Sequence, residues 1–149
     1  MPNITWSCRQ FDTLSGHELY EILSLRAEVF VVEQDCVYQD PDGLDLQSLH
    51  LCGHEGGGLV CYARLTPPAS RFPEPSIGRI VTCKARRGTG LGVELVQQAI
   101  AACHEHWPGQ AITISAQQYL EKFYRGFGFA SESEPYMEDG IPHLQMRLD

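Results

Sequence analysis

The segment Lys84–Gly92, KARRGTGLG, places three cationic side chains and three glycines within nine residues. Glycine lets a backbone approach a bulky ligand closely, and cationic side chains neutralise an anion. The segment lies between an expected strand and an expected amphipathic helix, where main-chain N–H groups and the positive end of a helix dipole converge. A helix-capping turn with solvated arginines would need the same glycines. The combination of strand, cations and helix favours a binding site for a phosphate ester.

The spacing of the glycines narrows the class of phosphate ligand. A Walker A loop needs a lysine directly after its last glycine, and a dinucleotide site needs G-x-G-x-x-G early in a βαβ unit. Here the glycines run G-x-G-x-G, no lysine follows them, and the next expected strand ends in ISAQQ rather than in an acid. The pattern that fits is R-x-x-G-x-G, with Arg87, Gly90 and Gly92 at its fixed positions.

Length and composition are those of an ordinary globular protein of one domain. The chain has 149 residues, 43% of them hydrophobic, and a formal net charge of −8, which together argue against a disordered chain. Without Lys84, Arg86 and Arg87 the remaining residues carry −11, so the positive charge of this segment is local. An acidic chain is poorly suited to replace the counterions of nucleic-acid phosphates. We therefore expect no nucleic-acid partner, and charge favours cationic partners.

Cysteine and histidine spacing argues against a metal site. The six cysteines are scattered without a C-x-x-C pair, and His104 and His106 are two residues apart, which puts them on different faces of a helix. We expect the cysteines to fill core positions and the histidines to cap carbonyls. The start MPNITWSCRQ lacks the charged and apolar regions of a signal peptide, and no apolar run is long enough to cross a membrane. These features favour a reducing cytoplasm and no membrane partner.

Alternating strands and helices must position these residues. A capping box, Ser15 with Glu18, opens a helix whose apolar stripe continues to Phe30. The acidic, turn-rich stretch 31–49 is typical of a long loop that could hold a short helix. The first half is expected to contain a strand at 4–9, a helix at 14–30, this loop, and two strands joined at a glycine-rich hairpin turn, 55–58. A proline-rich linker then leads to a strand at 77–82, the cationic glycine segment and a helix. The chain is expected to end with a strand at 111–116, a short helix at 119–128 and a strand at 144–148.

The R-x-x-G-x-G pattern resembles the pyrophosphate loop, [QR]-x-x-G-x-[GA], of the GCN5-related N-acetyltransferases (GNAT). A second match follows in QQYLEKFYRGFGF, where residues 123–129 resemble the F-Y-x-x-x-G-F signature of this family. The stretches LRAEVFVVEQDCVYQDPDGLD and YMEDGIPHLQMRL are similar to the ElaA-like branch, so the resemblance covers most of the chain. It implies an α/β, more closely α+β mixed, GNAT fold in one domain over residues 1–149. A central mixed, mostly antiparallel sheet, flanked by helices, would splay between its fourth and fifth strands.

The resemblance also implies acetyl-CoA as cosubstrate, with its pantetheine arm entering the splayed gap. Backbone groups of Ile80, Val81 and Thr82 would pair with that arm, and a main-chain N–H there would polarise the thioester carbonyl. Gln117 stands where the family often has asparagine, so the amide is kept but its reach is longer. Lys84 or Arg86 could reach further phosphates. The pyrophosphate would be held by Arg87, Gly88, Thr89, Gly90, Leu91 and Gly92.

Tyr124 stands where the family places the tyrosine that protonates the departing thiolate. Ordinary pKa values of about 10 for a phenol and about 8.5 for a thiol make that proton transfer favourable. Tyr124 could instead simply pack on the sheet. The base that deprotonates the acceptor ammonium is left open between Glu33, at the end of the first helix, and the histidines His50 and His143.

Charged residues around the first helix allow more than one interpretation. Asp40, Asp42 and Asp45 form an acidic loop that could attract a cationic amine, although acids in loops are usually solvated. Arg26 could instead order that loop by pairing with one of its acids. Arg79, beside the strand expected to bind the cofactor, has a comparable ambiguity: it could pair with an acid of this loop or remain solvated.

Taken together, these residues predict an acetyl-CoA-dependent N-acetyltransferase that moves an acetyl group directly to a primary amine in a ternary complex. The acceptor would be a small-molecule amine or a protein amine, and no metal is expected. A noncatalytic module that binds or senses acyl-CoA is the alternative. A homodimer is possible, since dimers are common in the family.

Overall fold

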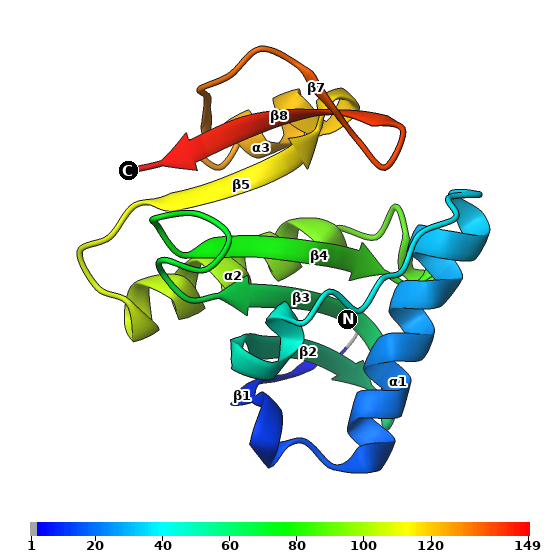
Figure 1. Ribbon diagram of the computed structural model, residues 1–149. Coiled ribbons are helices and arrows are strands. Elements are labelled where there is room, and N and C mark those ends of the chain that lie inside the picture. The colour runs from blue at the N-terminus through cyan, green and yellow to red at the C-terminus, as the bar shows by residue number, and fades with distance from the viewer. Residues whose placement is uncertain (1–2) are drawn as a thin grey trace.

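Two antiparallel sheets form the framework of the protein, and the computed structural model describes residues 3–149. The first sheet has its strands in chain order: β1 (Thr5–Gln10), β2 (Leu49–Glu55), β3 (Gly58–Thr66) and β4 (Ser76–Thr82). In the second sheet β8 (Ile141–Leu148) pairs with β5 (Ile112–Gln117), β6 (Ala130–Ser131) and β7 (Tyr136–Glu138). β4 and β5 are neighbours that run in the same direction (Figure 1). This arrangement confirms the predicted α+β fold.

Helices connect the strands and cover both faces of the first sheet. They are α1 (Gly16–Arg26), the π-helix η2 (Ala27–Glu33), α2 (Leu91–His106) and α3 (Glu121–Arg125), with short 3₁₀ turns η1 (Phe11–Thr13), η3 (Leu44–Gln47), η4 (Lys84–Arg86) and η5 (Gln118–Leu120). The predicted capping box is present, because the Ser15 side chain accepts from the Glu18 N–H and the Glu18 carboxylate accepts from the Ser15 N–H.

The two faces of the first sheet have separate cores, as the alternation of side chains along a strand requires. Cys52 of β2 and Tyr62 of β3 point to the face covered by α1 and η2. Leu51 and Ala63, one position away on the same strands, pack with Leu95 and other residues of α2 on the opposite face. The crossover from β4 through α2 to β5 therefore buries its apolar side against the sheet (Figure 1).

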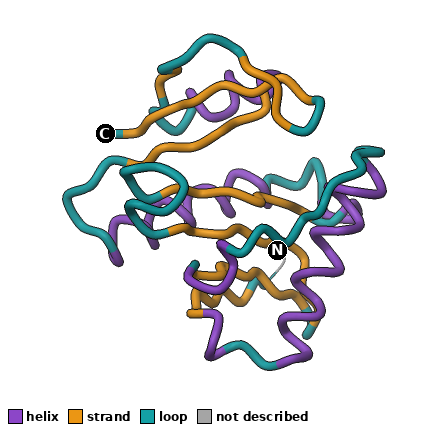
Figure 2. Tube along the Cα trace, viewed as in Figure 1, coloured by secondary structure: helices purple, strands orange, loops and turns teal. Residues whose placement is uncertain are grey.

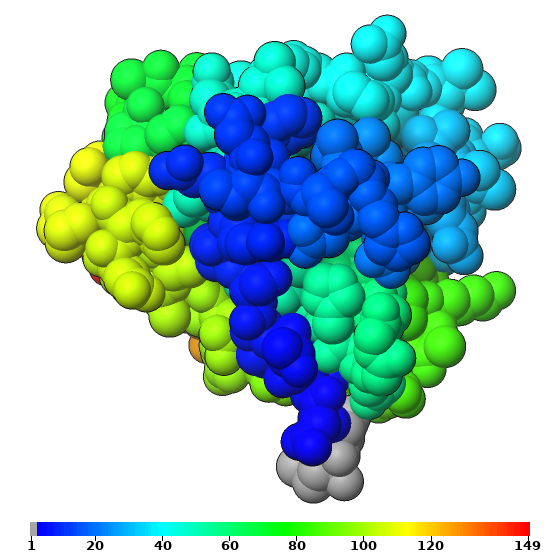
Figure 3. Space-filling model, turned by 90° about the horizontal axis from the view of Figure 1, so that it is seen from below, coloured from blue at the N-terminus to red at the C-terminus, as the bar shows by residue number. Residues whose placement is uncertain are grey.

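The hairpin between β2 and β3 forms where the glycines predict it. Gly56 and Gly57 both have positive φ, 60° and 86°, as a two-residue hairpin turn of type I′ requires. β1 is an edge strand, which within residues 3–149 pairs only with β2. Figure 3, seen from that side, shows the N-terminal segment in blue running over the surface.

The structure differs from the expected elements in four places. The last strand, β8, begins at Ile141, three residues before its expected start. The first helix ends at Arg26 as an α-helix and continues as π-helix η2 to Glu33, three residues beyond the expected end. The helix expected at 119–128 is only five residues long, Glu121–Arg125, preceded by a 3₁₀ turn. β6 and β7 were not expected, because strands of two and three residues are too short to show alternation.

The two sheets touch at one end and separate at the other. The Thr113 N–H of β5 donates to the Pro75 carbonyl just before β4, at 3.0 Å, and no ladder between β4 and β5 follows within the described residues. The loop that follows η2 runs across the α1 face of the first sheet towards η3 (Figure 2). The predicted splay between the fourth and fifth strands is thus present, and it opens one edge of each sheet.

Candidate functional site: a cleft between the two sheets

A cleft of about 360 Å³ lies between the separated edges of β4 and β5. Residues 77–82 of β4 form one wall, residues 114–117 of β5 form the other, and η2 closes one end. Most of the predicted site residues meet here although they come from five separate segments. Those that line the cleft are Glu33, Ile80, Val81, Thr82, Arg87, Gln117, Tyr124 and His143.

β4 contains a bulge on the cleft wall. Tyr62 of β3 lies opposite Val81, whereas Arg64, two residues further along β3, lies opposite Gly78, so β4 has one extra residue in this interval. Arg79 within the bulge has φ of +50°, an unusual conformation for a residue with a side chain. Within the described strands β4 pairs only with β3. The main-chain groups on its other edge are therefore free to bind a ligand.

The glycine segment continues from the cleft into the first turn of α2. Gly88 and Gly90 have φ of +76° and +88°, where other residues are strained. Gly90 is the N-cap of α2 and supplies no side-chain cap, so the first N–H groups of this helix lack an intrahelical or side-chain acceptor. Leu91 is buried, which leaves only its backbone for a ligand. These features fit an anionic group such as a pyrophosphate.

Two members of the segment have more ordinary roles than their spacing indicates. A Cβ on Gly92 would lie 3.9 Å from the Thr82 hydroxyl, an ordinary contact, so Gly92 does not need its small size in this structure. The Thr89 hydroxyl donates to the Arg86 carbonyl at 2.6 Å and so closes the turn before α2.

Arg87 and Glu33 form an ion pair at the end of the cleft next to the glycine segment. Nη2 of Arg87 donates to Oε1 of Glu33 at 2.8 Å, and the second guanidinium nitrogen also contacts the carboxylate. Hydrogen bonds from Arg87 lower the pKa of Glu33, which makes Glu33 a weaker base while the pair persists. Arg86 pairs with Glu55 and so is also engaged by an acid.

Tyr124 combines the two roles considered for it. Its ring is 6% exposed and packs edge-on against Phe123 and Phe129, with ring centroids 5.2 and 6.1 Å away. The residue also lines the cleft. Burial raises the pKa of Tyr124, so its phenol keeps its proton at neutral and moderately alkaline pH. A phenol that stays protonated is suited to donate a proton.

His143 of β8 has the geometry of a base. Its Nδ1 lies 2.7 Å from the Ile141 carbonyl, which can only accept, so Nδ1 carries the proton and Nε2 has the lone pair in the neutral ring. Nε2 lies 3.5 Å from Oε2 of Glu138, and the ring stacks on Tyr136. His143 ends the stretch 138–143, EDGIPH. This stretch forms the hairpin turn between β7 and β8, and four of its six residues line the cleft.

His50 is not available as the base. It is 1% exposed and does not line the cleft. Its Nε2–H donates to the Asp45 carbonyl at 2.9 Å, and the Tyr62 hydroxyl donates to Nδ1 at 2.6 Å. Burial lowers its pKa, so the ring stays neutral as a packing element. The interpretation of His50 as an alternative base is therefore wrong.

The acidic loop is neutralised by three arginines, and together they form an arginine–aspartate cluster. It comprises Arg26, Arg64, Arg79, Asp40, Asp42 and Asp45. Arg26 donates to Asp40 and Asp45 at 2.8 Å each and is fully buried, which confirms that it orders the loop. Because its acids are paired, this loop is not an open site for a cationic amine.

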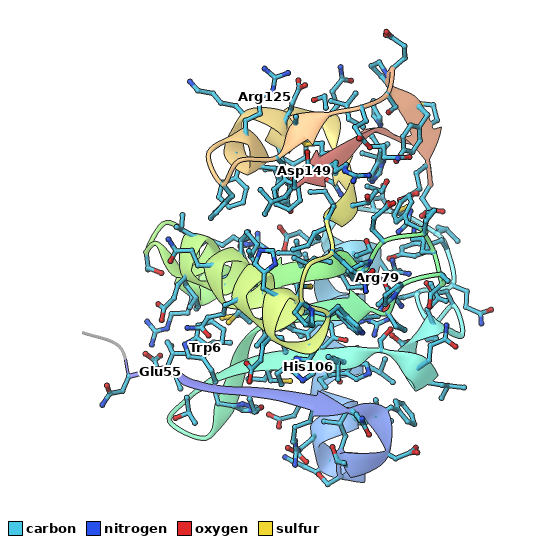
Figure 4. All side chains as sticks on the ribbon, turned by 90° about the vertical axis from the view of Figure 1, so that its left-hand side faces the viewer. Trp6, Glu55, Arg79, His106, Arg125 and Asp149 are labelled. Atoms are coloured by element: carbon cyan, nitrogen blue, oxygen red, sulfur yellow. The ribbon has the colours of Figure 1, made fainter. Side chains whose placement is uncertain are left out.

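The cluster also reaches the bulge of β4. Nε of Arg79 donates to Oδ1 of Asp40 at 2.7 Å, and Nη2 donates to the Asp40 carbonyl at 2.9 Å. In Figure 4 Arg79 lies beside the first sheet, whereas Arg125 is at the outer side of the second. Asp40 thus anchors the one residue of the bulge that has positive φ, which offsets the cost of that conformation.

Sequence reasoning missed part of the second-sheet wall. Arg71, from the loop before β4, pairs with Glu138 of β7. Ser115 of β5 contacts the Tyr136 hydroxyl at 2.5 Å and lies 3.5 Å from Glu138. Arg71, Ser115 and Glu138 all line the cleft. The proline-rich context of Arg71 gave no sign that this loop folds back over β5.

Other features of the described part of the chain complete the site. All six cysteines are free, and His106 caps the Ala102 carbonyl at 2.9 Å as expected. Between residues 3 and 149 no group of three or more His, Cys, Asp or Glu side chains could hold a metal ion. Within the same range, every helix is too short or too polar to cross a membrane.

Comparisons with known proteins agree with the cleft geometry. Residues 19–149 match the family model described as acetyltransferase (GNAT) domain. A UPF0039 protein of Synechocystis is 48% identical over 96% of this chain and 94% of its own length. The crystal structure of an acyl-CoA N-acyltransferase from Pseudomonas aeruginosa superimposes with a TM-score of 0.95 at 42% identity, covering 99% of this chain and 100% of that one.

The predicted branch of the family is supported in the same way. The crystal structure of Escherichia coli ElaA gives a TM-score of 0.93 at 39% identity, again over 99% of this chain and 100% of the other. The curated E. coli ElaA sequence is 41% identical over 96% of this chain and 95% of its own length. With its splayed sheets, its glycine segment and these relatives, the chain belongs to the GNAT acetyltransferase family, on its ElaA-like branch.

Proposed function

We propose that this protein transfers an acetyl group from acetyl-CoA directly to a primary amine. One observation carries the proposal: Arg87, at the start of the glycine run, lines the same cleft as Tyr124 and His143. Binding groups for a phosphorylated thioester and groups that can move protons thus share one space. Membership of a family of acyl-CoA N-acyltransferases supports the same reaction class.

The donor would be held by backbone groups on two elements. The unpaired edge of β4 offers N–H and C=O groups to the amides of a pantetheine arm, as an added strand would be bound. The uncapped start of α2 offers N–H groups to the pyrophosphate. A phosphate would also compete with Glu33 for Arg87, so binding of the donor would release the Glu33 carboxylate.

The β4 bulge would supply the electrostatic part of catalysis. The bulge lies on the cleft wall, and a main-chain N–H on its unpaired edge would donate to a thioester carbonyl as negative charge develops on the oxygen. Because Arg79 is tied to Asp40, the bulge is held in place before the substrate arrives. Such preorganised donors cost little reorganisation during the reaction.

Proton transfer would be divided between two side chains. Nε2 of His143 takes a proton from the acceptor ammonium, whose neutral nitrogen then attacks the thioester carbon. The new N–C bond forms, the C–S bond breaks, and Tyr124 protonates the leaving thiolate. The nitrogen then loses its second proton, which restores the Tyr124 phenol and leaves a neutral amide. Glu33 is the alternative base once Arg87 is engaged by phosphate.

A panel of amines tests this proposal. Purified protein is incubated with acetyl-CoA and each amine, and free thiol and acetylated amine are both measured. We expect thiol release that depends on the amine and equals the amount of product. Tight acetyl-CoA binding with no acetylated product from any amine would contradict an enzyme and support the alternative of a noncatalytic sensor.

A further inference from the structure

One ion pair in the cleft has no part in the acetyl transfer as proposed above. Arg71 and Glu138 face each other on the second-sheet wall, and their side chains are 28% and 32% exposed. Arg71 comes from the loop before β4 and Glu138 from the hairpin of β7 and β8, so the pair crosses between two segments. Both groups are accessible from the cleft rather than sealed in the core.

The carboxylate of Glu138 lies beside the groups that would handle the acceptor. Nε2 of His143 is 3.5 Å from its Oε2, and the Ser115 hydroxyl is 3.5 Å from its Oε1. An ammonium group held at Glu138 would therefore lie next to the lone pair of His143. This position suits the amine that must lose a proton before it reacts.

The other arginines of the cleft are committed elsewhere. Arg79 is held by Asp40 and Asp42 of the arginine–aspartate cluster. Arg87 and Glu33 pair at the cofactor end. Asp139 also lines the cleft, and its carbonyl accepts from the Cys36 thiol at 3.3 Å. Arg71 is thus the cation on the acceptor side whose carboxylate partner, Glu138, is itself exposed to the cleft.

An acceptor that opens this pair must compensate both of its charges. A simple amine would take Glu138 and leave Arg71 without a counter-charge, and a simple carboxylate would do the reverse. A desolvated charge without a partner is costly. A molecule with both an ammonium and a carboxylate gives Glu138 and Arg71 each a new partner of opposite charge, so no charge is left unpaired. A guanidinium binds a carboxylate strongly when the contact is bidentate.

We propose that the acceptor is a small amino acid derivative with a free amino group and a free carboxylate. Its ammonium binds Glu138 beside His143, and its carboxylate binds Arg71. This inference rests on the proposed acetyl transfer, since it names the acceptor of that reaction. The Cys36–Asp139 contact ties the loop after η2 to the turn between β7 and β8, which narrows this side of the cleft and favours a small molecule over a protein segment.

Matched acceptors give the first test. For several amino acids, kcat/KM is compared among the free amino acid, its amide and the corresponding decarboxylated amine. We expect the free amino acid to be favoured by about tenfold or more, as one charge-assisted bidentate contact allows. Equal or better rates with the amides or amines would overturn the inference and leave the proposed function standing. Acetylation of none of them would contradict both.

Variants of Arg71 give the second test. Arg71→Gln is expected to lower kcat/KM for the amino acid about tenfold and to leave that for the decarboxylated amine within about twofold. Arg147→Gln is the control, because Arg147 is similarly exposed, also pairs with an acid, and does not line the cleft. Binding of coenzyme A by all three proteins checks that they are folded. An Arg71→Gln variant that loses activity equally for both acceptors would contradict the carboxylate contact.

Discussion

Tyr124 is buried against two aromatic neighbours, Phe123 and Phe129, yet borders the cleft, and burial raises the pKa of its phenol. A phenol that remains protonated can serve as general acid across the pH range in which the protein is folded. Its removal should therefore affect the chemical step rather than donor binding.

We predict that Tyr124→Phe lowers kcat about 100-fold, because general acid catalysis contributes 10²–10⁴-fold. The Kd for coenzyme A should stay within about twofold, since the ring and its packing remain. Tyr20→Phe is the control, as Tyr20 is exposed on α1. Steady-state kinetics and calorimetric titration measure the two quantities. A full kcat in Tyr124→Phe would remove the phenol from the mechanism.

Gly90 and Gly57 form a matched pair for testing the glycine segment. They have φ of +88° and +86°, and a Cβ on either would meet no heavy atom within 4 Å. Replacing either by alanine should cost about 1 kcal/mol of stability through the left-handed conformation.

Only Gly90→Ala is expected to weaken coenzyme A binding, by about tenfold, because Gly90 leads into the uncapped start of α2. Titration of coenzyme A into both variants measures this. Equal affinities of the two variants would mean that the glycine segment does not hold the pyrophosphate.

At the residue scale, sequence is most informative where spacing carries the signal. Arg87, Gly90 and Gly92 are recognisable because their spacing matches the loop of the family. The ion pair between Arg71 and Glu138 was missed because the two residues are 67 positions apart, and only the fold brings them together. His50 was misjudged, since a histidine in a sequence gives no sign that both of its ring nitrogens have buried partners.

At the scale of elements, the bulge of β4 is the feature that links the arginine–aspartate cluster to the cleft. Arg79 pays a conformational cost at φ of +50°, and its contacts with Asp40 offset it. Arg79→Gly and Arg79→Ala separate the effect of backbone conformation from that of the side-chain contacts. Both remove the contacts with Asp40, but only glycine adopts positive φ freely.

We predict that Arg79→Gly is more stable than Arg79→Ala by about 0.5 kcal/mol or more, and that it retains a higher kcat. The reason is that alanine strains the bulge whereas glycine preserves it. Urea unfolding and initial rates measure the difference. If the alanine variant matched or exceeded the glycine variant in both, the bulge geometry would not matter for catalysis.

His50 of β2 contacts Tyr62 of β3 and the Asp45 carbonyl of η3, and its burial there makes the free energy of unfolding depend on pH. Burial lowers the pKa of His50 below its ordinary value of about 6.5. Below that pH the unfolded chain gains a proton that the folded protein does not, so stability is complete above about pH 7 and falls as the pH decreases. Between about pH 4 and 2 a further loss should follow, because hydrogen bonds from Arg64 outweigh burial and lower the pKa of Asp42 to about 2.

We predict that His50→Gln removes a slope of up to about 1.4 kcal/mol per pH unit in unfolding free energy just below neutral pH. His17→Gln is the control and should keep the slope, because His17 is 83% exposed. Urea unfolding across this pH range measures both. The same slope in His50→Gln and in the unchanged protein would assign the dependence to another group.

Sequence predicted the long elements well and the short ones poorly. α2 and the strands of the first sheet have enough residues for their apolar periodicity to be visible. β7 has three residues and exists because it pairs with β8, so its formation depends on tertiary structure. The apolar stripe that continues to Phe30 predicts a helix there, but it does not distinguish the π-helical winding of η2 from an α-helix.

At the scale of the whole molecule, two sheets meet near Thr113 and Pro75 and separate to form a cleft. Contacts of Arg71 with Glu138 and of Cys36 with the Asp139 carbonyl link the two sides of this cleft. Arg87 pairs with Glu33 on the first-sheet side. The fold class followed from two motifs that resemble a family. The shape of the acceptor end did not, because it is built from loops whose course only the folded chain reveals.

The proposed function requires that donor and acceptor occupy the cleft together. Initial rates measured while acetyl-CoA and an accepted amine are both varied test this most directly. Direct transfer predicts double-reciprocal lines that intersect, because both substrates must be bound before the first product leaves. Parallel lines would indicate a covalent acyl-enzyme and would contradict transfer within one shared cleft.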